Sequence, residues 1–188
     1  NFSINTSLEA QIASISDDIA YNSHDLEDGL KSNLFKINDL DNIPILKKII
    51  LKEKKKLKNY SMDLVLRQII RDIINEMVRD VIKTTKENIK NYKIKTLKDV
   101  YDSSRQIVSF SDKMKEFDLK IKFFLKQKMY FHKSVNKKTD YGRKIIKNLF
   151  LKIKKEPKKY ININKYKNSS LERIICDYIA GMTDRYAI

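Results

Sequence analysis

The 188-residue sequence is poor in the residues that interrupt or cross-link secondary structure. It contains three glycines, two prolines, one cysteine and no tryptophan. Turn formers are scarce, and isoleucine and lysine recur at helical spacing, which argues against a sheet protein. The single cysteine excludes an internal disulfide, and Cys176 lies in an apolar run that predicts a buried structural thiol. The sequence therefore predicts one all-helical domain, or part of a larger helical protein.

Several functional classes are also excluded by what is missing. No apolar run reaches the roughly 18 residues that cross a bilayer, and no secretory signal is present, so we expect a soluble, cytoplasmic protein. The sequence has no G-x-x-x-x-G-K-[ST] phosphate loop, no G-x-G-x-x-G and no G-x-S-x-G. The two histidines, His24 and His132, show no zinc-like spacing with the cysteine.

Acidic residues are a minority, and their distribution is uneven. The chain has 40 basic and 24 acidic residues, for a formal net charge of +16. The first thirty residues contain no Lys or Arg and six carboxylates: Glu9, Asp17, Asp18, Asp25, Glu27 and Asp28. An acidic segment in a basic chain is what a hard-cation site facing a polyanionic substrate requires. The simpler explanation of the positive charge is solvated helix faces in a Lys-, Ile- and Asn-rich chain of an A/T-rich genome.

Residues 8–30 predict an amphipathic helix. Six apolar residues fall on one side and are expected to face the core: Leu8, Ile12, Ile15, Ile19, Leu26 and Leu30. On the opposite side Asp17, Tyr21 and Asp25 follow each other at i, i+4 and i+8, so they stack along one face with His24 and Asp28. Spacing alone favours a solvated polar face and does not prove a site.

Further helices are expected over residues 61–91, from 111 to about 132, over 141–155 and over 171–188. The apolar positions of residues 61–91 recur every three or four residues and predict a core helix: Leu64, Leu66, Ile69, Ile70, Ile73, Ile74, Met77, Val78, Val81 and Ile82. The aromatic residues of 111–132, Phe123 among them, are also expected in the core. Gly181 beside Ala180 suggests a close approach of two helices.

Three segments resemble motifs of one known family. They are SLEAQIASISDDIAYNSHDLEDGL, IVSFSDKMKEFDLKIKFFLKQKMYFHKSV and RIICDYIAGMTDRYAI. In this order they resemble the metal-ligand segment, the "V-F-S-x-x-M…L-K-x-F-L…Y-x-H" segment and the C-terminal signature of deoxyguanosinetriphosphate triphosphohydrolase-like proteins of the HD superfamily. The resemblance implies an all-α helical bundle, the C-terminal part of a dNTP triphosphohydrolase. Residues 1–37 would end the HD domain, and residues 38–188 would form a C-terminal helical region.

The resemblance also implies roles for three residues. Asp17 would be the fourth ligand of an H…HD…D set that holds Mg²⁺ or Mn²⁺, and a carboxylate suits either ion. Tyr21 would contact the sugar and phosphates, for which its ring offers an apolar face and a polar tip. Asp25 would accept a hydrogen bond from the 3′-hydroxyl. The implied reaction is metal-assisted attack of water on the α-phosphorus, which converts a dNTP into deoxynucleoside and triphosphate.

The chain departs from the family pattern in two respects. The upstream His and His-Asp ligands are missing, and His24-Asp25 lies downstream of the fourth ligand, so it is not the catalytic pair. Ser134 stands where the family usually has an arginine, which puts triphosphate binding in doubt. Because the sequence starts at Asn1 without an initiator Met and its first recognisable element is an interior motif of the family, we expect the C-terminal part of a longer protein. Another chain would then supply the N-terminal HD part, or this chain would be an inactive remnant.

Two expectations concern partners. Relatives assemble into homo-oligomers, so the resemblance implies self-association. A function of a different class is a basic helical module for nucleic-acid binding or assembly. It would use the lysine run at 52–58 and the Tyr/Lys connector at 158–167.

Overall fold

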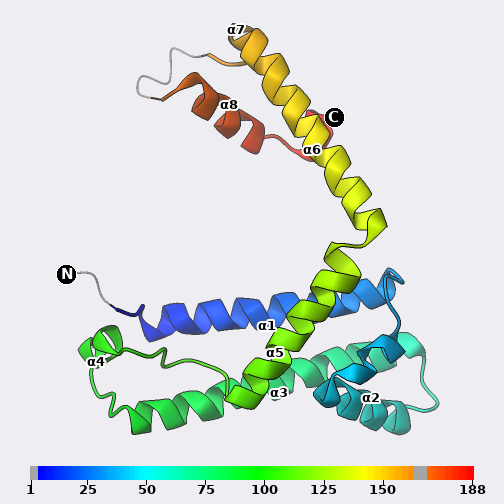
Figure 1. The fold of residues 1–188 in the computed structure, drawn as a ribbon, viewed down its shortest axis with the longest axis vertical. Helices are drawn as coiled ribbons and strands as arrows, with labels where there is room; N and C mark the ends of the chain where they lie inside the picture. Colours follow the sequence, from blue (N-terminus) through cyan, green and yellow to red (C-terminus); the bar gives the residue numbers. More distant parts are fainter. Residues whose placement is uncertain (1–3, 163–168) are drawn as a thin grey trace. The chain divides into compact units, whose positions relative to one another are not determined.

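The computed structural model describes residues 4–162 and 169–188, and in these ranges it contains helices and no strand (Figure 1). The predicted all-α fold class is therefore confirmed. Contacts divide the chain into two compact units, Asn1–Tyr130 and Phe131–Ile188. The boundary expected at residues 37 and 38 concerns the family's HD domain and stays a prediction. No described helix combines the length and the hydropathy that a bilayer crossing requires.

The first unit is built on long helices that pack around one apolar core. Its elements are α1 (Leu8–Lys31), the 3₁₀ helix η1 (Ile37–Asn42), α2 (Pro44–Lys56), α3 (Met62–Asn91), α4 (Leu97–Asp102), α5 (Asp112–Leu125) and the π-helical turn η2 (Lys126–Tyr130). α3 packs against both α1 and α2, and α5 crosses α1 (Figure 1). Fully buried side chains fill the space between them, including Leu26, Leu46, Ile73, Met77 and Ile121. Each such residue contributes about 1.5–3 kcal/mol by leaving water.

Hydrogen bonds fix where α1 and α5 begin. Ser7 caps α1, accepting from the Ala10 N–H at 3.3 Å, and Ser111 caps α5, accepting from the Met114 N–H at 3.3 Å. Both caps are predicted by the sequence. Ser111 in turn donates from its N–H and its hydroxyl to the Asp80 carboxylate at 2.8 and 2.6 Å. The N-cap residue of α5 is thereby hydrogen-bonded to α3.

The buried amide of Gln11 joins α1 to the loop before α5. Its Oε1 accepts from the N–H groups of Ile107 and Val108, both at 3.0 Å, and its Nε2 donates to the Thr6 carbonyl at 2.9 Å. Gln11 is only 2% exposed. The hydrogen bonds make this burial possible, because an unpaired buried amide would be costly.

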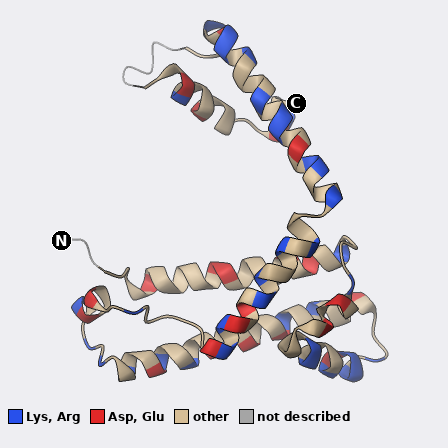
Figure 2. Ribbon diagram, in the orientation of Figure 1, with Lys and Arg blue, Asp and Glu red and all other residues tan. Residues whose placement is uncertain are grey.

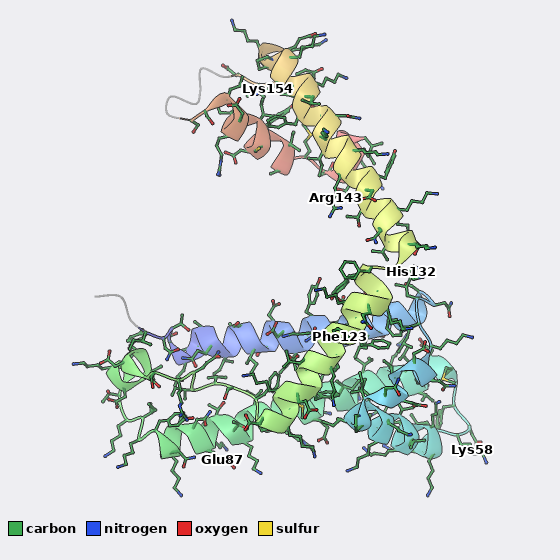
Figure 3. The ribbon with its side chains drawn as sticks, in the orientation of Figure 1. Lys58, Glu87, Phe123, His132, Arg143 and Lys154 are labelled. Atoms are coloured by element: carbon green, nitrogen blue, oxygen red, sulfur yellow. The ribbon has the colours of Figure 1, made fainter. Side chains whose placement is uncertain are left out.

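Several apolar residues expected in the core are exposed, and the prediction is wrong for Ile12, Leu64, Val78, Ile82 and Phe123. Phe123 is labelled on α5 in Figure 3. The buried arc of α1 includes the polar residues Gln11, Asn22 and Ser23, so it is centred further from Ile12 than the apolar pattern indicates. In the described residues nothing covers the outer edges of α1 and α3 where Ile12 and Ile82 lie.

The second unit has a smaller core of its own. It consists of α6 (Lys133–Lys155), α7 (Pro157–Tyr160), α8 (Leu171–Ala180) and α9 (Asp184–Ala187). α6 packs against α8, and Ile153, Ile174 and Ile175 are buried between them. Lys154 of α6, labelled in Figure 3, forms an ion pair with Glu172 of α8 at 2.9 Å. Pro157 follows the end of α6, where a proline cannot continue the helix.

Other predictions for this unit need correction. α6 begins at Lys133 and not at Tyr141. The last long helix ends at Ala180, with Gly181 as its C-cap, and a Cβ at Gly181 would approach only carbonyls of its own helix. Gly181 therefore marks a helix end, and no other described helix of this chain lies against it. Cys176 is exposed and not buried. Residues 163–168 of the Tyr/Lys connector lie outside the described residues.

Gly29 and Gly142 provide a matched test of the packing. A Cβ at Gly29 in α1 would overlap the Phe35 ring, which is buried and packs edge-to-face on Phe124 at 4.8 Å. We expect Gly29→Ala to lower the unfolding free energy by about 1–2 kcal/mol, since overpacking outweighs the gain in helix propensity.

Gly142→Ala in α6 is the control, because nothing lies within 4 Å of a Cβ there. We expect it to stabilise by up to about 1 kcal/mol. Urea unfolding of both variants measures the difference, and equal effects at the two glycines would contradict the packing of Phe35 against Gly29.

Candidate functional site

The polar face of α1 points away from the core of the first unit, as its spacing predicts. Asp17, Tyr21 and His24 are exposed and Asp25 is half-buried. Asp17 has no hydrogen bond or ion pair with any described residue, so both of its carboxylate oxygens are available. His24 lies 3.9 Å from Glu27 and belongs to the surface of the helix.

Asp25 is hydrogen-bonded to the last residue of the first unit. The hydroxyl of Tyr130, in η2, donates a short hydrogen bond to Asp25 Oδ2. The pKa of the Tyr130 hydroxyl is raised well above its ordinary value, first because the group is partly desolvated and then because it faces the Asp25 carboxylate and the Tyr21 hydroxyl. Tyr21, Asp25 and Tyr130 thus form one cluster, to which α1 and η2 both contribute.

Tyr130 is not among the site residues that the sequence predicts, although it belongs to the Y-x-H segment. Helical periodicity relates residues within one helix, whereas Asp25 and Tyr130 are 105 positions apart. The end of α5 also departs from α-helical phase, because η2 is a π-helical turn. The Y-x-H resemblance was the available signal.

A buried network holds α5 against α1 beside this cluster. Asn22 Nδ2 donates to Asp118 Oδ1 at 2.8 Å, and Lys122 Nζ lies 2.9 Å from Asp118 and 3.3 Å from Asp18. Burial lowers the pKa of Lys122, but the two carboxylates outweigh burial and raise it overall. These contacts fix the rotation of α1, so the direction in which its polar face points is set by α5.

The carboxylates of the described residues do not form a complete metal site. No group of three or more His, Cys, Asp or Glu side chains in residues 4–162 and 169–188 is placed to hold an ion. Asp18, next to Asp17, is paired with Lys122 instead. Mg²⁺ or Mn²⁺ prefers about six oxygen ligands, several of which are waters at protein sites. Asp17 can supply one protein ligand, and the described residues do not hold the ion by themselves.

His132 and Ser134 serve the local structure of the second unit. His132 is the N-cap of α6, and its Nδ1 accepts from the Ser134 N–H at 3.4 Å and lies 2.7 Å from the Ser134 hydroxyl. Arg143, labelled on α6 in Figure 3, is exposed and pairs with Asp140 at 3.1 Å. Arg143 is therefore a surface charge of α6.

The lysine run of α2 is partly neutralised. Lys52 lies 2.9 Å from Asp72 and 3.3 Å from the buried Glu53, and these contacts raise the pKa of Lys52. The remaining lysines gather at the C-terminal end of α2, where Figure 2 shows them in blue. A helix C-terminus favours positive charge, so this position has a structural explanation.

Comparison with known proteins places this architecture in a class. Residues 108–188 match the phosphohydrolase-associated domain. The chain is 51% identical over all of its 188 residues to a deoxyguanosinetriphosphate triphosphohydrolase-like protein of Pelagibacter ubique, of which it covers 50%. Like-named proteins of Leptospira interrogans and Brucella ovis are 38% and 34% identical over 96% and 97% of the chain, and 49% and 46% of their own lengths are covered.

The fold and the domain match define an all-helical protein with a phosphohydrolase-associated domain. More particularly, the chain is similar along its length to deoxyguanosinetriphosphate triphosphohydrolase-like proteins, in agreement with the resemblance of its motifs. It spans about half the length of the curated relatives that it matches.

The raised pKa of Tyr130 predicts a dependence of stability on pH. The unfolded chain releases the Tyr130 proton at about pH 10, whereas the folded chain retains it to higher pH. This contribution to stability is complete below about pH 10 and is lost as the pH rises toward the folded pKa. Tyr130→Phe removes it, so the unfolding free energy of this variant should fall less between about pH 8 and about pH 11 than that of the wild type. Urea unfolding at both pH values measures the decrease in unfolding free energy of each protein. Identical decreases in the variant and the wild type would contradict the Tyr130–Asp25 contact.

Proposed function

We propose that this chain is the C-terminal portion of a metal-dependent dNTP triphosphohydrolase, and that it contributes one metal ligand and part of the nucleotide pocket. The observation that carries the proposal is the 51% identity to a deoxyguanosinetriphosphate triphosphohydrolase-like protein over the whole chain. Two features of α1 support it. Asp17 is unpaired among the described residues, and Tyr21 and Asp25 on the same face form a cluster with Tyr130 of η2. The reaction is hydrolysis of a dNTP to deoxynucleoside and triphosphate.

Each residue has a role that its surroundings permit. Asp17 offers carboxylate oxygens to a divalent ion, which would polarise the phosphate and activate water when bound. Tyr21 is 60% exposed, so its ring is accessible to the sugar and its hydroxyl to the phosphates. Tyr130 hydrogen-bonds Oδ2 of Asp25 and thereby orients the carboxylate, which leaves Oδ1 to accept from the 3′-hydroxyl.

The proposal includes a division of the site between polypeptides. The remaining ligands, a His and a His-Asp pair by family resemblance, come from an N-terminal HD part outside this sequence. Homo-oligomerisation is part of the same proposal. Ser134 is neutral and takes part in the cap of α6, so cationic side chains at other positions must neutralise the charge of the triphosphate. If no polypeptide completes the site, the chain is an inactive remnant of the family.

The basic nucleic-acid-binding module is the alternative of a different class. Lys52 of its lysine run is already paired within the first unit, which weakens this surface. DNA binding that falls steeply between about 50 and about 200 mM salt, with no dependence on Mn²⁺, would favour the module over the hydrolase.

The decisive variant is Asp17→Ala. We expect triphosphate release from dNTPs with Mg²⁺ or Mn²⁺ only when this chain is mixed with a polypeptide that carries the HD part of the family. Asp17→Ala should lower the rate by about a hundredfold or more, because one ligand of the ion is lost. Asp28→Ala removes another exposed carboxylate from α1 and should leave the rate unchanged. Equal rates for the two variants, or no release from any folded mixture, would contradict the proposal.

A further inference from the structure

An apolar groove runs between α1 and α3 in the first unit. Its volume is about 360 Å³, and it is lined by Ile12, Ile15 and Ile19 from α1 and Val78, Val81 and Ile82 from α3. Three of these side chains are open to solvent although they are purely aliphatic. Ile12 and Ile82 are each 50% exposed, and Val78 is 39% exposed. Clustered aliphatic side chains on a surface typically mark an interaction site.

The groove is apolar within a strongly charged chain. Charged residues make up 34% of the sequence, yet no acidic residue and only one basic residue, Lys86, line the groove. Its other polar lining residues are Ser16 and Thr85. The Thr85 hydroxyl is buried and has no hydrogen-bond partner among the described residues. A lining with so little charge suits an apolar occupant.

The sequence pattern indicates that these positions are meant to be covered. Ile12 falls on the apolar stripe of α1, and Val78 and Ile82 fall on that of α3, so periodicity assigns all three to a core. Their exposure in this structure is explained if the element that completes this part of the core belongs to another polypeptide. Leu64 and Phe123 are exposed elsewhere on the first unit, whereas these three residues line one groove.

The groove and the proposed metal ligand lie on different sides of α1. At about 100° per residue, Asp17 stands about 140° from Ile12 around the helix. The proposed function requires further ligands at Asp17, so a polypeptide that docks in the groove has to extend around α1 to supply them.

We propose that the α1–α3 groove is the docking site for an apolar helix from the half of the family protein that this chain does not span. The occupant is inferred from the relatives, of which the chain covers 50% and 49% of the length. The inference rests on the proposed function, because that function requires the other half to bring its ligands to Asp17. The docked helix presents aliphatic side chains to Ile12, Val78 and Ile82.

The test is co-expression of this chain with the half of the Pelagibacter ubique relative outside the matched segment. We expect the two polypeptides to purify as a complex, with amide hydrogen exchange slowed in α1 around Ile12–Ile19 and in α3 around Val78–Thr85. Ile82→Glu should weaken the complex by at least about tenfold, since a charge would be buried in an apolar contact. Ile12→Glu should do the same.

Leu119→Glu is the matched control. Leu119 is 57% exposed on α5 of the same unit and does not line the groove, so this variant should leave the complex intact. Melting of each variant alone establishes that it folds, because all three side chains are at least half exposed in the isolated chain. The proposal is overturned if the two halves do not associate, if both groove variants bind as the wild type does, or if Ile82→Glu instead disperses a dimer of this chain.

The same samples separate the two proposals. A complex that is sensitive to Ile82→Glu but releases no triphosphate with Mn²⁺ would support the docking site and refute the hydrolase function. Release that is lost in Asp17→Ala, from a complex that still forms, would support both.

Discussion

Burial of one arc of α1 is the constraint on which the first unit depends. α3 and α5 pack on that arc, and two polar side chains inside it are paired, Gln11 with the loop before α5 and Asn22 with Asp118 of α5. These directional contacts leave α1 one rotation about its axis, unlike purely apolar packing, which tolerates small slips. The direction of Asp17, Tyr21 and Asp25 follows from that rotation. The candidate site is therefore positioned from the buried side of the helix.

Much of this architecture could be predicted from the sequence. The scarcity of glycine and proline and the recurrence of Ile and Leu at helical spacing were sufficient for the all-α class and for the presence of the long helices. Ser7, Ser111 and Ser170 cap α1, α5 and α8 with a side chain of the type that favours this position. The exposed placement of Asp17 and Tyr21 also follows from spacing, because the phase of a long helix is set by its apolar residues.

The rest depended on tertiary contacts that a periodic pattern does not contain. Gln11 looks like a surface residue until the amides of Ile107 and Val108 are placed beside it. Tyr130 reaches Asp25 through the packing of α5 on α1. α6 starts earlier than expected because His132 provides a side-chain cap, a role usually filled by Ser, Thr, Asp or Asn. In each case the missing information is a partner distant in sequence or an unusual cap.

Because η2 is a π-helical turn, the direction of Tyr130 depends on the number of residues that precede it in this turn. A π turn contains one more residue than the α turn that it replaces, and each residue advances an α-helix by about 100°. The extra residue therefore changes the side of the helix on which Tyr130 emerges, and in this structure that side faces Asp25. In evolutionary terms, a one-residue deletion between Lys126 and Tyr130 could preserve every named side chain and still separate this pair. For homologues, the spacing of these residues is as informative as their identity.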